Sequence, residues 1–123
     1  MSMNSLTKIE AFKLFEIDAL KLPKSLVHGR PFYNTGKRTR NYLLDTWIAS
    51  ERGTPGFNIF LTETFAISYL PRFKVRYPRL RLCKIMIYED EIITKENSNY
   101  HLVPRMMIES TAWQLAKSGK ELI

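Results

Sequence analysis

Hydrophobic residues near the start of the chain recur as they would on a helix. Thr7 and Glu10 have the spacing of a capping box, and the apolar side chains that follow cover a wide arc up to Pro23. The pattern predicts a helix over residues 7–22. An arc this wide is typical of a helix that docks firmly against a sheet or against a second copy of the chain.

Two further segments show helical spacing. Residues 37–51 repeat the period and run into a stretch rich in glycine and proline, and residues 104–118 begin with proline and are followed by Gly119. The sequence therefore predicts a central helix and a C-terminal helix in addition to the first.

Between these helices the pattern favours strands. Residues 57–62 and 80–88 are apolar runs, whereas residues 71–77 alternate bases with apolar groups and are followed by Pro78, which suits an edge strand. Shorter strands are expected at 25–28, at 92–94 as the return strand of a hairpin with 80–88, and at 100–103. Residues 64–70 fit either a helical turn or more strand.

This order of elements predicts an α+β fold built as a single compact domain over residues 1–123. It consists of a mainly antiparallel sheet of about four short strands, covered by the N-terminal, central and C-terminal helices. With 123 residues, 45% of them hydrophobic and 12% aromatic, the chain has enough apolar bulk for one core.

Composition also suggests a cellular compartment. The single cysteine cannot form an internal disulfide, and the first residues lack the apolar run of a signal peptide. No span of 18 uncharged apolar residues occurs, so no membrane span is expected. We therefore expect a cytoplasmic, intracellular protein that is not secreted.

Charge is the most unusual property of the sequence. The chain has 19 Lys and Arg against 12 Asp and Glu, a net charge of +7, and residues 22–84 alone hold twelve bases and three acids. This concentration predicts an anionic partner for the middle of the chain, although a basic surface that only promotes solubility remains the alternative.

The bases fall into two clusters. One lies at the start of the predicted central helix, where positive charges oppose the helix dipole unless an anion sits there. The other follows the extended stretch from residue 72, where side chains two apart approach the spacing of phosphates along a nucleic-acid strand. Two aromatic residues before the first cluster are candidates for base stacking. The candidate nucleic-acid or anion-binding residues are Lys37, Arg38, Arg40, Arg72, Lys74, Arg76, Arg79, Arg81, Phe32 and Tyr33, with Lys84 at the end of the second cluster.

Signatures of catalysis are scarce. His28, Cys83 and His101 are too widely spaced for a metal site, and the acidic run at 89–91 fits a solvated turn. We therefore assign no catalytic residue, no metal ligand and no cofactor from the sequence.

One resemblance to an enzyme family exists. Ser25-Leu26-Val27-His28-Gly29 resembles the histidine-glycine strand of ADP-ribosyltransferases that use a His-Tyr-Glu set, and residues 56–62 with Ala66 and Tyr69 are similar to their second motif. The resemblance implies an NAD-dependent transferase with His28 at the NAD site. Phe60 stands where that family has a tyrosine, the stretch from Thr62 to Ala66 is two residues short, and Glu109 is the nearest match to the glutamate.

The leading expectation is a small, basic, non-enzymatic protein that binds RNA, DNA or a nucleoprotein complex through phosphate contacts. The first alternative is an interaction or inhibitor protein, of the kind that mobile elements encode, docking on an acidic protein surface. Binding to an anionic membrane surface and ADP-ribosyltransferase activity are lesser alternatives. The wide apolar arc at 7–22 and the edge strand at 71–77 would also allow a homo-oligomer.

Overall fold

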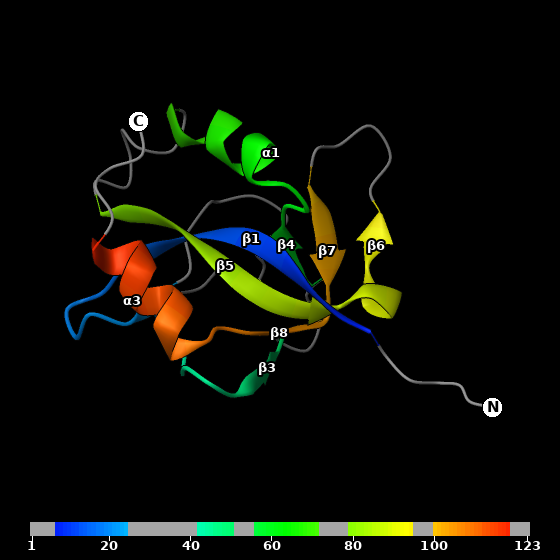
Figure 1. Cartoon of the computed structure of the whole chain (residues 1–123), viewed down its shortest axis with the longest axis horizontal. Coiled ribbons are helices and arrows are strands. Elements are labelled where there is room, and N and C mark those ends of the chain that lie inside the picture. The colour runs from blue at the N-terminus through cyan, green and yellow to red at the C-terminus, as the bar shows by residue number, and fades with distance from the viewer. Residues whose placement is uncertain (1–6, 25–41, 51–55, 72–78, 95–99, 119–123) are drawn as a thin grey trace.

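A computed structural model describes residues 7–24, 42–50, 56–71, 79–94 and 100–118. These residues form two antiparallel sheets, two α-helices and one 3-10 turn (Figure 1).

The larger sheet has five strands, and its long central pair crosses the middle of the molecule (Figure 1). The strands, in spatial order, are β2 (Pro23–Lys24), β1 (Lys8–Ile17), β5 (Leu80–Tyr88), β8 (Arg105–Met107) and β3 (Trp47–Ala49). β1 and β5 pair along almost their whole length, from Lys8 opposite Tyr88 to Glu16 opposite Leu80. This pair is the framework on which the other elements are placed.

The smaller sheet consists of β4 (Phe57–Ile59), β7 (His101–Val103) and β6 (Ile93–Thr94), with β7 in the middle. It joins the larger sheet at the edge of β1, where Phe12 and Phe60 exchange both backbone hydrogen bonds at 2.8 Å. Pro104 connects β7 directly to β8, so the chain also passes from one sheet to the other there.

Side chains define where both helices begin. Thr62 caps α1 (Glu63–Ser68) by accepting the Phe65 N–H at 3.3 Å. α3 (Ser110–Ser118) is capped from a distant part of the chain, because the Asp45 carboxylate accepts the Ser110 N–H at 2.8 Å. The 3-10 turn η2 (Glu89–Glu91) follows β5.

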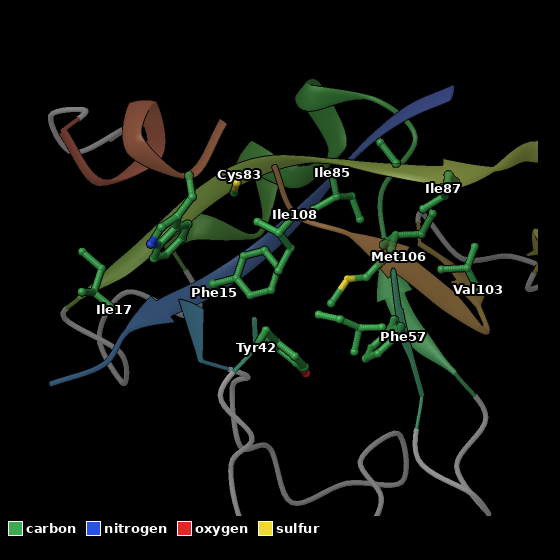
Figure 2. Packing of buried hydrophobic residues seen from close by; sticks show 14 residues of the cluster. Phe15, Ile17, Tyr42, Phe57, Cys83, Ile85, Ile87, Val103, Met106 and Ile108 are labelled. Atoms are coloured by element: carbon green, nitrogen blue, oxygen red, sulfur yellow. The ribbon is translucent and has the colours of Figure 1, made fainter. Parts of the chain in front are cut away.

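Two groups of apolar side chains lie on opposite sides of β1. In the larger one, Phe15 packs edge-on against Tyr42 and Trp113 between the two sheets and α3 (Figure 2). The smaller one is formed under α1 by Leu14, Phe60, Ala66, Leu70 and Leu80. The strand is therefore apolar on both of its faces.

This two-sided burial explains why the predicted N-terminal helix is wrong. Residues 8–17 form strand β1 instead, with Ala11, Phe15 and Ile17 in the larger core and Phe12 and Leu14 against the smaller one. A strand buried on both faces reads as a nearly continuous apolar run, which also satisfies a helical period. The wide arc that suggested a second copy of the chain is thus covered by the chain itself.

The expected central helix is wrong over its described part. Residues 42–46 are not helical, Asp45 has the left-handed φ of 58°, and residues 47–49 form β3. Residues 37–41 lie outside the described residues. Strand β3 exists because β8 pairs with it, a contact between segments almost sixty residues apart that no local pattern reveals.

The C-terminal helix begins six residues later than expected. Residues 105–107 form β8, and the helix starts at Ser110, where Asp45 supplies the cap. The hairpin expectation is also wrong, since β6 pairs with β7 rather than with β5. The strands expected at 80–88 and 100–103 are found as β5 and β7, whereas the one expected at 57–62 is found only over residues 57–59, as β4.

The fold expectation as a whole is therefore wrong. The described residues form eight strands in two sheets with two helices, not about four strands under three helices. None of the helices among these residues has the length and apolar character needed to cross a membrane.

Candidate functional site

The positive charge of the chain is divided unevenly between described and undescribed residues. The described residues contain nine Lys or Arg and nine Asp or Glu, so they are neutral overall. The remaining residues therefore carry the whole net charge of +7. Two stretches account for it: residues 25–41 hold four bases, residues 72–78 hold three, and neither holds an acid.

The described residues on either side of 25–41 lie together. Lys24 is opposite Glu16 at the end of β1, and their side chains form an ion pair of 3.9 Å. Where the description resumes, the Tyr42 N–H donates to the Pro23 carbonyl at 3.0 Å. The stretch thus leaves and rejoins the framework at neighbouring residues.

The residues flanking 72–78 lie at this same end of the large sheet. Arg79 accepts a hydrogen bond of 3.1 Å at its carbonyl from the N–H of Ile17, the last residue of β1. Leu70, near the end of α1, packs in the smaller core together with Leu80. We call the end of the sheet formed by Glu16, Ile17, Lys24, Tyr42 and Arg79 the basic corner, because both basic stretches begin or end there.

The structure describes only three of the sequence-predicted bases, and they do not share one face. Arg79 is exposed. Arg81 pairs with Phe15 on the side of the larger core, where its Nη1 donates to the Leu80 carbonyl at 2.9 Å and its buried Nε has no hydrogen-bond partner. Lys84 lies on the opposite side and pairs with Glu10 at 3.5 Å. The other candidates (Phe32, Tyr33, Lys37, Arg38, Arg40, Arg72, Lys74 and Arg76) lie outside the described residues.

Sequence reasoning missed a second site, which is centred on Lys13. This residue lies on β1 between Ala11 and Phe15, both of which are fully buried, and strand alternation turns its side chain to the same core. Its Nζ donates to the Asn58 carbonyl at 2.8 Å and lies 5.8 Å from the ring centroids of Phe15 and Phe57. Desolvation lowers the pKa of Lys13 to about 8.

The thiol of Cys83 lies directly across from Lys13 in the β1–β5 pair. Cys83 is buried, and burial raises the pKa of its thiol to about 12, with Lys84 opposing the shift. A thiol with this pKa stays protonated and unreactive near neutrality. Within the described segments, no three His, Cys, Asp or Glu side chains are grouped so that they could hold a metal ion.

Another cation, Arg105, lies among aromatic rings of β3 and β5. The rings of Trp47 and Tyr88 stack with centroids 4.5 Å apart, and the Arg105 guanidinium carbon lies 4.5 Å from the Tyr88 centroid. Glu91 accepts three hydrogen bonds of 2.8–3.0 Å from this guanidinium. Those bonds raise the pKa of Arg105, so the group is a satisfied ion pair.

The second motif of the resemblance to ADP-ribosyltransferases, residues 56–62 with Ala66 and Tyr69, lies among the described residues, as does Glu109. Phe60, at the position of the family's tyrosine, is 6% exposed and packs in the smaller core against Tyr69. Glu109 is exposed just before α3. His28 lies outside the described residues.

Comparison with known proteins identifies no relative: no family model, no curated protein and no solved structure matches the chain.

Proposed function

We propose that the protein binds nucleic acid through phosphate contacts made at the basic corner. One observation carries the proposal: described residues that flank both acid-free basic stretches meet at one end of the larger sheet, while the described residues as a whole are neutral. Seven bases lie in the two stretches of sequence that begin or end at this corner, and such a concentration of positive charge attracts a polyanion.

Chemistry favours a phosphate backbone over other anions. Five of these seven bases are arginines, whose planar guanidinium can bind a phosphate with two hydrogen bonds. Phe32 and Tyr33, in the same stretch as four of the bases, supply aromatic rings for stacking on exposed bases. Single-stranded RNA or DNA is therefore the proposed ligand.

The test is fluorescence anisotropy with a labelled single-stranded oligonucleotide over a series of salt concentrations. The logarithm of affinity should fall linearly with the logarithm of salt, with a slope near −0.7 for each phosphate contact. Replacing Arg72 and Arg76 by Glu should reduce the slope by roughly 1.4, because two contacts are lost.

A matched variant controls for net charge. Lys8→Glu with Lys84→Glu changes the charge equally, but Lys8 pairs with Tyr88 at the far end of β1, and Lys84 lies within β5. This variant should weaken binding while leaving the slope unchanged. Equal slopes for the two variants, or an affinity that does not depend on salt, would refute nucleic-acid binding at the corner. Capture of an acidic protein that survives nuclease treatment would favour the protein-docking alternative.

A further inference from the structure

The side chain of Lys13 lies in an unusually apolar environment for a lysine. It belongs to β1, which pairs along its length with β5, and its neighbours on the same face are Ala11 and Phe15, both without exposed surface. Lys13 itself keeps partial exposure, so its side chain is enclosed by the core but still reached by solvent.

The hydrogen bond that Nζ of Lys13 makes can be formed by a neutral amine as well as by a charged one. Nζ donates to the backbone carbonyl of Asn58 at 2.8 Å, and the ring centroids of Phe15 and Phe57 each lie 5.8 Å from Nζ. Among the described residues no carboxylate forms an ion pair with Lys13, whereas Lys24 and Lys84 pair with Glu16 and Glu10. Without a countercharge, this surrounding favours the uncharged amine, which is the nucleophilic form.

The lowered pKa of Lys13 has a large effect on the fraction of neutral amine. Its pKa of about 8, against an ordinary 10.5, raises the neutral fraction near pH 7 by on the order of 100-fold. The neighbouring nucleophile, Cys83, is 1% exposed and its thiol pKa is raised to about 12, so it does not compete.

We propose that Lys13 is a reactive amine site that forms an imine with small, apolar aldehydes. The lone pair of Nζ attacks the carbonyl carbon and a C–N bond forms. The carbonyl oxygen then leaves as water with the two amine protons, so no oxidant or reductant is needed. The rings of Phe15 and Phe57 make the surroundings of Nζ apolar, which favours a small, uncharged aldehyde over a charged one. This site is independent of the basic corner and of nucleic-acid binding.

The experiment treats the full chain with propionaldehyde near neutral pH, traps imines with borohydride, and measures the modified fraction at each lysine by peptide mass mapping. Lys13 should be modified at least about 10-fold faster than Lys8 and Lys84. This is less than the gain in neutral fraction, because partial burial slows the approach of the aldehyde to Nζ. In denaturant all lysines should react alike, because the preference arises from the folded environment.

Two variants complete the test. Lys13→Arg should abolish the fast modification and leave the slow modification of the other lysines unchanged. Lys84→Arg, on the opposite side of the sheet, should leave the fast modification intact. Modification of Lys13 in the folded chain that is no faster than that of Lys8 would overturn the proposal, whether charge or access were the cause.

Discussion

Two cations of this protein lie beside pairs of aromatic rings, yet their environments act in opposite directions. Lys13 is 5.8 Å from the centroids of Phe15 and Phe57, and Arg105 is 4.5 Å and 5.7 Å from those of Tyr88 and Trp47. The pKa of Lys13 is lowered and that of Arg105 is raised. Similar rings therefore do not determine the charge state.

The difference lies in the countercharge. Arg105 is held by the Glu91 carboxylate, and the hydrogen bonds between them are the main cause of its raised pKa. Lys13 has a backbone carbonyl in that place, so desolvation is not offset. Contact with aromatic rings thus stabilises the charged form of a side chain less than a carboxylate does. A lysine that is surrounded by rings and lacks a carboxylate partner is therefore a candidate for a reactive group.

The largest expected effect comes from removing the charge that the core disfavours. Lys13→Met should raise the free energy of unfolding at pH 7 by about 2 kcal/mol. The lowered pKa corresponds to roughly 3 kcal/mol, and the lost hydrogen bond to Asn58 offsets about 1 kcal/mol. Urea denaturation of both proteins measures this difference. A destabilised Lys13→Met protein would show that Lys13 stabilises the fold as a cation and would remove the contrast with Arg105.

The lowered pKa of Lys13 also predicts that the stability difference between Lys13→Met and the wild type depends on pH. Below pH 8 Lys13 is charged in both the folded and the unfolded chain, so its full cost is present. Between pH 8 and 10.5 only the unfolded chain keeps the proton, and wild-type stability rises. The advantage of Lys13→Met should therefore shrink by about 1 kcal/mol between pH 8 and 9. Cys83, whose raised pKa lowers stability above pH 9, affects both proteins equally and cancels in the difference. An advantage that stays constant with pH would contradict a lowered pKa.

A smaller effect is expected when the other cation loses its countercharge. Glu91→Gln should lower the free energy of unfolding by less than Lys13→Met raises it, because the two-pronged contact is stronger than an ordinary surface pair but is partly exposed. The loss should decrease as salt is added, which denaturation at two ionic strengths would show. Glu89→Gln in the same turn is the control, since Glu89 is exposed and has no ion pair among the described residues, and it should change stability by less than about 0.5 kcal/mol. Equal losses in the two variants would mean that the Arg105 pair contributes nothing.

Part of the fold could be predicted from local sequence. The apolar run of residues 80–88 is bounded by Pro78 and by an acidic turn, and this local pattern is enough to predict strand β5. Strands β3 and β8 could not be predicted in this way, because each is defined by pairing with the other across more than fifty residues. The start of α3 likewise depends on a distant residue, because the Asp45 carboxylate caps the helix at Ser110. The prediction that this helix starts at Pro104 is therefore wrong.

The candidate sites, too, could be predicted from the sequence only in part. The excess of bases is a property of the sequence, but the nearness of the described residues that flank the two basic stretches depends on the register of β1 with β2 and β5. Lys13 was missed because a lysine in an amphipathic helix is expected to face solvent. Had residues 9–17 been read with a period of two, Ile9, Ala11, Phe15 and Ile17 would have placed Lys13 on the buried face.

The smallest expected effect tests whether environment, rather than loss of a positive charge, accounts for the first prediction. Lys84→Met makes the same chemical change on the neighbouring strand, but the Lys84 side chain is 50% exposed and its pair with Glu10 is an ordinary surface pair. Stability should therefore change by less than about 0.5 kcal/mol, with no added dependence on pH between 8 and 9. Because the chain carries a net charge of +7, removing any lysine relieves some repulsion, and this relief should be alike at the two positions. If denaturation showed that Lys84→Met stabilises as much as Lys13→Met, general repulsion would explain both gains, and the core around Lys13 would have no special effect on its charge.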